Sequence, residues 1–305
     1  MQLKLIGVSL KETFKAWNDR DPFASSAVLA YYTIFSLPGL LVIVVNIAGY
    51  FWGREAVTNE ITGQVGGMIG KETAGYIQNI IANASISKGT IISSILGIAT
   101  LIFGATGVFY HVQQIFNKIW EVKPKPKTKQ KILQLLRDRL FSFGLILVIG
   151  FLLLVSLVLS AVLQSLSNWV ARHLSSSLLI VFNIADLLIS VGIITFLFAA
   201  MYKYLPDAKI QWRDVWVGAL ISTILFVIAK YALGLYFGTS KPGSAYGAAG
   251  SIILIMLWVS YSGLILMFGA EFTRIFAKKK GRYIPPQEIA EKDRANEGFG
   301  SKKKA

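Results

Sequence analysis

The sequence predicts an all-α, polytopic membrane protein with six transmembrane helices and both termini in the cytoplasm. Two observations predict this fold. Six long apolar runs recur along the 305 residues, and the Lys and Arg residues gather in alternate connections between those runs. A helix of about 20 apolar residues crosses a hydrocarbon core of about 30 Å. Each run is therefore long enough to span a bilayer.

The predicted spans form one membrane domain at residues 23–277. A cytoplasmic amphipathic helix at 1–22 precedes this domain, and a basic cytoplasmic tail at 278–305 follows it. The six spans lie at about 27–50, 91–110, 140–163, 178–202, 214–237 and 251–276.

The distribution of positive charge predicts the orientation. Of the 31 Lys and Arg residues, 25 lie in the two terminal segments and in the connections after the second and fourth spans. Cytoplasmic loops of helical membrane proteins carry this excess. We therefore expect these four segments in the cytoplasm and the chain in an inner or plasma membrane.

The composition argues against several functions. Hydrophobic residues make up 54% of the chain, charged residues only 15%, and Cys is absent. Disulfides, thiolate nucleophiles and Cys-ligated metals are therefore excluded. The net charge is +15, and the cationic residues lie next to the spans, where they attract anionic headgroups. We therefore expect a lipid bilayer rather than nucleic acid as partner. We expect no cofactor, no metal and no catalytic residue, and homo-oligomerisation is left open.

The connections have local patterns of their own. Apolar residues at helical spacing predict an amphipathic surface helix that the pair Asp21-Pro22 ends. The external segment 51–90 has the pattern of two short amphipathic helices that cap the outer face. Lys123-Pro124-Lys125-Pro126-Lys127 cannot be helical, and the polar tail is expected to be disordered from about Gln287.

Proline and glycine residues mark candidate kinks or gates in the spans. Pro38 lies near the middle of the first span and predicts a kink or a broken helix there. Small residues elsewhere permit close helix packing or mark discontinuous helices around a site, and packing is the simpler interpretation. The candidate kink or gating residues are Pro38, Gly39, Gly104, Gly107, Gly247 and Gly250.

Ionisable residues inside the spans are candidates for a transport site, because burying a charge in a bilayer is costly. Asp186 and Lys230 both lie about 10 to 12 Å from the outer ends of their spans. Asn183 and Ser190 share the helix face of Asp186, and Asn46 adds a polar group in the first span. One interpretation is a structural ion pair. The other is an outward-facing cavity in which Lys230 contacts an anion and Asp186 is available for proton coupling.

A second pair of charges lies near the inner end of the last span. Glu271 and Arg274 are three residues apart on the predicted helix. An i, i+3 ion pair near a helix C-terminus is the expected arrangement, with a structural role.

Several segments together resemble the YihY/virulence factor BrkB family of bacterial inner-membrane proteins. Their order and spacing carry the resemblance, since no single one is diagnostic. The segments are Ala30-Tyr31-Tyr32-Thr33 through Ser36-Leu37-Pro38, Phe116-Asn117-Lys118-Ile119-Trp120, Leu205-Pro206-Asp207 with Trp212 and Gly218-Ala219, Tyr246-Gly247, Leu257-Trp258 and Gly269-Ala270-Glu271.

The resemblance implies a six-span protein that is often regarded as a transporter and is linked in some members to envelope lipid movement or serum resistance. Members have also been labelled ribonuclease BN. The residues argue against a nuclease, because His111 and His173 fall on opposite sides of the bilayer and Asp138, Asp207 and Asp214 are isolated among cations. A two-metal site needs clustered carboxylates.

A membrane transporter or lipid translocator is therefore the leading prediction, with an unknown lipid or small solute as substrate. Intramembrane charges and kinked spans offer polar groups a route through apolar surroundings. The alternative is a non-transporting scaffold that organises envelope enzymes through its amphipathic segments. That alternative needs neither a cavity nor a coupling ion.

Overall fold

The computed structural model describes residues 2–86, 107–125, 176–240, 246 and 249–293. Most of this part is helical, and four of its helices are long and apolar enough to cross a membrane. The predicted span 140–163 and most of 91–110 lie outside the described residues. The elements are α1 Gln2–Asn18, α2 Pro22–Trp52, α3 Arg54–Ile69, α4 Lys71–Ile86, β1 Val122–Pro124, α7 Ser176–Tyr204, α8 Trp212–Ser240, α9 Gly250–Lys279 and β2 Ala290–Lys292.

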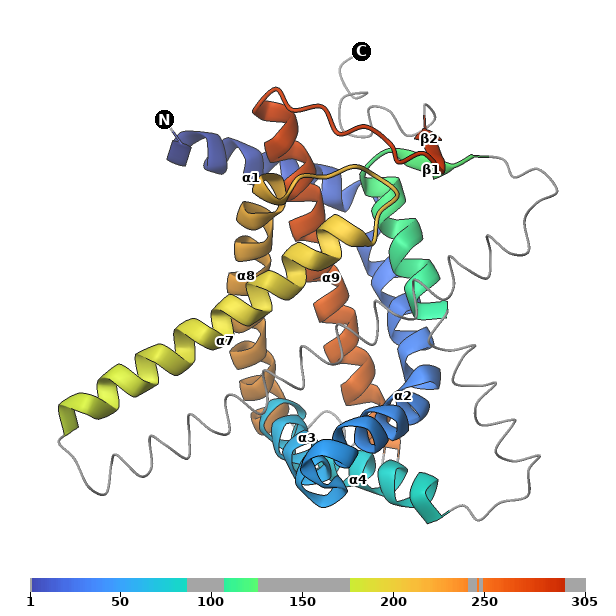
Figure 1. Ribbon diagram of the computed structural model, residues 1–305, viewed down its shortest axis with the longest axis vertical. Helices are drawn as coiled ribbons and strands as arrows, with labels where there is room; N and C mark the ends of the chain where they lie inside the picture. The colour runs from blue at the N-terminus through green and yellow to red at the C-terminus, as the bar shows by residue number, and fades with distance from the viewer. Residues whose placement is uncertain (1, 87–106, 126–175, 241–245, 247–248, 294–305) are drawn as a thin grey trace.

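The segments that carry the excess of positive charge meet at one end of the molecule (Figure 1). We call this the basic end; it comprises α1 and the connections 120–125, 205–211 and 280–293. The hairpin of α3 and α4 lies at the opposite end, as the prediction of two external helices requires. Between the two ends, α9 packs against α1, α2 and α8, and α7 packs against α8.

The start of the chain folds as its sequence predicts. α1 ends at Asn18, and Asp21 has a left-handed backbone φ of 49° before Pro22 opens α2. Asp is one of the few residues that adopt this conformation at low cost, and Pro is favoured at a first helical position. The indole Nε1 of Trp17 donates to the carbonyl of Leu264 at 3.2 Å, which fastens α1 onto α9.

Two glycines separate the helices at the end opposite the basic end. Gly53 and Gly70 have φ values of 85° and 105°, which residues with a side chain rarely adopt. Each glycine lies between two consecutive helices. Apolar residues of α2, α3, α4 and α9 then pack together; they include Leu41, Val45, Val57, Ile77, Ile81 and Ile255.

The basic end contains a small sheet that the sequence pattern does not indicate. β1 pairs antiparallel with β2, with Val122 opposite Lys292 and Pro124 opposite Ala290. The expectation that the tail is disordered from Gln287 is wrong as far as residue 293. The side-chain amide Nε2 of Gln287 donates to the carbonyl of Pro206 at 3.2 Å, and the backbone N–H of Gln287 donates to the carbonyl of Asp207 at 2.9 Å. These contacts tie the tail to the α7–α8 connection.

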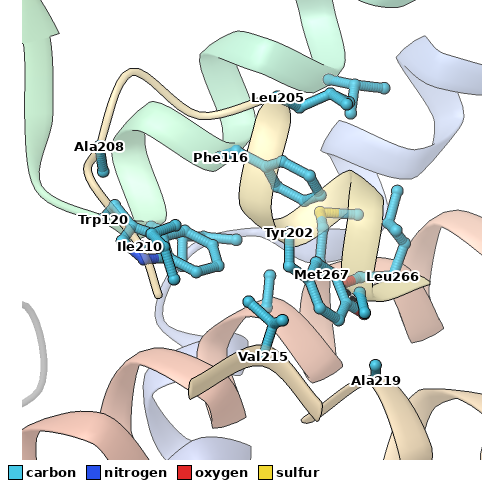
Figure 2. Packing of buried hydrophobic residues seen from close by; sticks show 14 of the residues in the cluster. Phe116, Trp120, Tyr202, Leu205, Ala208, Ile210, Val215, Ala219, Leu266 and Met267 are labelled. Atoms are coloured by element: carbon cyan, nitrogen blue, oxygen red, sulfur yellow. Dashed lines mark hydrogen bonds between the residues drawn. The ribbon is translucent and has the colours of Figure 1, made fainter. Parts of the chain in front are cut away.

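The main apolar core lies next to the basic end (Figure 2). Its rings come from the 107–119 helix and α7, with Phe116 and Tyr202 meeting edge to face at 5.8 Å between ring centroids. Aliphatic residues of α8 and α9 complete it, among them Val215, Leu266 and Met267. This core therefore joins the 107–119 helix, α7, α8 and α9, and α2 contributes Leu29 to it.

Candidate functional site

Four charged side chains form a closed ring beneath the basic end. We call Arg20, Glu121, Glu271 and Arg274 the ionic cluster. They come from three places: the junction of α1 and α2, the end of the 107–121 segment, and α9. Because two acids and two bases alternate around the ring, the cluster is electrically neutral.

Each member of the ionic cluster contacts two others. Arg20 lies 3.3 Å from Glu271 and 3.8 Å from Glu121, measured between guanidinium nitrogen and carboxylate oxygen. Arg274 donates to Glu121 at 2.8 Å and also pairs with Glu271. A further guanidinium N–H of Arg20 donates to the carbonyl of Lys118 at 2.6 Å, at the end of the 107–119 helix. The cluster thereby links three segments that are distant in the sequence.

The ionic cluster is deeply buried. The side chain of Glu271 is 1% exposed and that of Arg20 is 5% exposed. Burial lowers the pKa of Arg20, and the charge of Glu271 acts in the opposite direction. Glu121 has a left-handed φ of 56°, which costs a non-glycine residue about 1 kcal/mol. The Glu121 carboxylate closes the ring, and its contact with Arg274 is the shorter of its two ion pairs.

An amide clamp lies beside the ionic cluster. The carboxylate of Asp207 accepts from Asn117 at 2.7 Å and from Gln113 at 3.0 Å, and the backbone N–H of Asp207 donates to the Asn117 carbonyl oxygen at 2.8 Å. These bonds join the 107–119 helix to the α7–α8 connection. Asp207 is therefore a structural residue and not an isolated loop carboxylate.

Asn117→Ala should lower the free energy of unfolding by about 2 kcal/mol, because it leaves buried polar groups of Asp207 with fewer partners. SDS titration in mixed micelles, followed by circular dichroism, measures the loss. Gln64→Ala is the matched control, since its amide bonds only Glu60 on the same helix. Equal effects of the two substitutions would contradict the clamp.

The predicted outer polar site lies only partly within the described side chains. Ser190 on α7 and Lys230 on α8 are both half-buried. The backbone of Asn46, Asn183 and Asp186 is helical, but their side chains lie outside the described part. Pairing of Asp186 with Lys230 therefore stays a prediction. Lys230 lies 18 positions after the first residue of α8, about 27 Å along the axis from the basic end.

The candidate kink residues have separate outcomes. α2 continues as a helix through Pro38 and Gly39, so the helix is not broken there. A kink at Pro38 and a gating role stay predictions. Gly107 lies against the ring of Tyr32, where a Cβ would come within 2.6 Å of Cδ1. Gly250 opens α9 and is buried. Gly104 and Gly247 lie outside the described residues.

Hydroxyl groups connect α7, α8 and α9 at the level of the main core. The Tyr202 hydroxyl lies 2.6 Å from Ser222 Oγ and donates to the carbonyl of Leu266 at 3.1 Å. Thr195 donates to Thr223 at 3.0 Å. Hydroxyl bonds of this kind hold helices together in membranes.

The described side chains do not form a ligand set for a metal ion. Within the described part of the chain, no three His, Asp or Glu side chains are placed to hold a metal ion. His111 lies 3.3 Å from the carbonyl of Ser25 and beside the ring of Tyr32. His173 lies outside the described residues. The histidine that is described therefore has a packing role at the α2 contact.

Known proteins resemble the chain along most of its length. A relative from Pseudoalteromonas atlantica, called a UPF0761 membrane protein, is 26% identical over 261 residues, which is 82% of this chain and 80% of the relative. A Bacillus subtilis relative whose name describes it as ribonuclease-like is 24% identical over 275 residues, 89% of this chain and 96% of the relative.

Some relatives are considerably longer. A UPF0761 membrane protein from Delftia acidovorans is 27% identical over 208 residues, which is 67% of this chain but only 45% of the relative. The chain thus spans less than half the length of that protein. No solved structure is significantly similar to the chain.

A family pattern matches most of the chain. The sequence pattern of the family described as "Virulence factor BrkB" matches residues 13–294. That range includes every member of the ionic cluster and the amide clamp. The chain is a membrane protein and belongs to the Virulence factor BrkB family.

Proposed function

We propose that this chain is a carrier that moves a lipid or a small polar solute across the cytoplasmic membrane, with its basic end in the cytoplasm. The observation that carries the proposal is an asymmetry along the helices. Buried charges and the main core close the basic end. Towards the other end, the first half of α7 extends away from the remaining described helices (Figure 1).

A carrier must open alternately to the two sides of the membrane. The described arrangement fits a form that is closed at the basic end. Opening that end would separate the α1–α2 junction, the 107–121 segment and α9, and would break the contacts of Arg20 and Glu121 in the ionic cluster. The pair Glu271 and Arg274 would remain, because both residues belong to α9. The cluster would thus act as an inner gate.

The charges in the outer half supply the polar site of the proposed carrier. Lys230 would contact an anionic group of the substrate, and Asp186 would be available for proton coupling. Both are expensive to keep in apolar surroundings, which favours a functional role. A half-buried position of Lys230 is compatible with access to a substrate.

Lys230→Met should reduce transport at least tenfold while the protein still accumulates in the membrane, because Met keeps the length and apolar stem but cannot contact an anion. Asp186→Asn should have a comparable effect. Proteoliposomes loaded with fluorescent anionic and zwitterionic lipids measure the rate of movement between leaflets.

Lys278→Met is the matched control, since it removes the same charge from an exposed position at the basic end. Its rate should stay within about twofold of the parent rate. Full activity in Lys230→Met would remove Lys230 from the site and would favour its interpretation as a structural residue.

A further inference from the structure

A cavity of about 720 Å³ lies at the basic end, between the α7–α8 connection and the segment that follows α9. Its size falls within the range of pockets that hold small molecules. The cavity is separate from the outer polar site, because Lys230 lies about 27 Å along α8 from this end. Its charged lining residues are Lys203, Lys209, Arg213, Asp214 and Arg282.

The lining of the cavity is strongly positive. Four cationic side chains face a single carboxylate, and Arg282 already pairs with that carboxylate on Asp214. Lys209 and Arg213 are exposed, so their charged groups are accessible from the cavity. Lys203 Nζ donates to the carbonyl of Ile210 at 2.6 Å, which holds its charge at the wall. An anion that enters would therefore meet an excess of cations.

The walls of the cavity are held by backbone and amide contacts. The N–H of Lys209 donates to the carbonyl of Pro285 at 2.8 Å, and Ala208 forms an isolated antiparallel β-bridge with Pro286. Gln287 adds its bond to the carbonyl of Pro206 at 3.2 Å. These bonds fasten the α7–α8 connection to the tail. A site whose walls are already in place loses less free energy on ordering when it binds a ligand.

Aromatic residues of the kind that is enriched at the interface between membrane and water lie beside the cavity. Trp212 stacks on Phe196 and lies near Tyr204 and Trp216, where α7 ends and α8 begins. The first turn of α8 also borders the cavity, and the positive end of a helix dipole favours anions.

We propose that this cavity binds a phosphate group, carried either by an anionic phospholipid headgroup or by free phosphate in the adjoining solution. Lys209 and Arg213 bind the phosphate oxygens, and Lys203 contributes a fixed charge at the wall. Asp214 keeps Arg282 in position. This site does not depend on the proposed transport function, because neither Lys230 nor the ionic cluster takes part in it.

Native mass spectrometry of the full-length chain in detergent tests the lipid source. The probes are phosphatidylglycerol and phosphatidylcholine, added separately to the parent, to Lys209→Gln/Arg213→Gln and to Lys11→Gln/Lys278→Gln. The control pair removes the same charge from exposed residues at the basic end that do not line the cavity. We expect the parent to retain phosphatidylglycerol preferentially. The cavity variant should lose this retention at least tenfold, and the control should stay within twofold.

Calorimetric titration with inorganic phosphate tests the soluble source on the same three proteins. Phosphate binding in the parent and control that is lost in the cavity variant would assign free phosphate as a ligand. Selective phosphatidylglycerol retention without phosphate binding would assign the lipid headgroup. The proposal is overturned if neither probe binds, or if the cavity variant and the control lose binding equally, since equal losses indicate only diffuse electrostatic attraction.

Discussion

Glu271→Gln should lower the free energy of unfolding by about 3 kcal/mol, because it leaves Arg20 and Arg274 buried with a single carboxylate between them. Gln keeps the size of the side chain, so the loss reports on charge and not on a cavity. The measurement is the SDS mole fraction at which half the protein unfolds in mixed micelles, followed by circular dichroism.

Two companion variants make the Glu271 result specific. Glu12→Gln breaks an ion pair with Lys279 in which Glu12 is 55% exposed, and it should cost less than about 1 kcal/mol. Glu271→Gln/Arg274→Gln restores neutrality and should recover part of the stability, because Arg20 and Glu121 then balance each other. A Glu271→Gln protein as stable as Glu12→Gln would contradict the ionic cluster.

Gly269→Ala should destabilise the protein by about 3 kcal/mol through overpacking. A Cβ on this glycine of α9 would collide with the Ser222 hydroxyl of α8 and with the Tyr202 hydroxyl of α7. Gly218 on α8 is equally close to Thr273 and the Gly269 carbonyl, so Gly218→Ala should behave similarly. Small residues let helix backbones approach closely in a membrane. The same SDS titration measures both variants.

Gly234→Ala is the control for this prediction. Gly234 also belongs to α8, but a Cβ there meets nothing within 4 Å in the described structure. Since Ala favours a helix over Gly by about 1 kcal/mol, this variant should be neutral or slightly stabilised. If Gly269→Ala proves no less stable than Gly234→Ala, the close crossing of α8 and α9 is wrong.

Sequence patterns predict those features that depend on local chemistry. Hydropathy alone locates the four described membrane helices to within about five residues at each end. The Asp21-Pro22 pair marks the break between α1 and α2. Gathering of cations in alternate connections predicts that these connections meet at one end, which Figure 1 shows.

Features that depend on distant contacts are not predictable in this way. Glu271 and Arg274 are visible as an i, i+3 pair, but Arg20 and Glu121 join them from positions at least 150 residues earlier in the chain. Likewise, β1 finds its partner β2 in a tail whose composition indicates disorder. The preference of residues for helix or strand is a property of one segment, whereas these contacts arise from packing between segments.

Movement of lipid between the leaflets of proteoliposomes tests whether the chain is a carrier. Fluorescent lipids in the inner leaflet are protected from an impermeant reductant added outside. Protein-containing liposomes should lose this protection at least tenfold faster than protein-free liposomes, and Lys230→Met liposomes should resemble the protein-free sample. Equal rates with and without the parent protein, for lipids and for small anionic solutes alike, would overturn the proposed carrier function and would favour a scaffold.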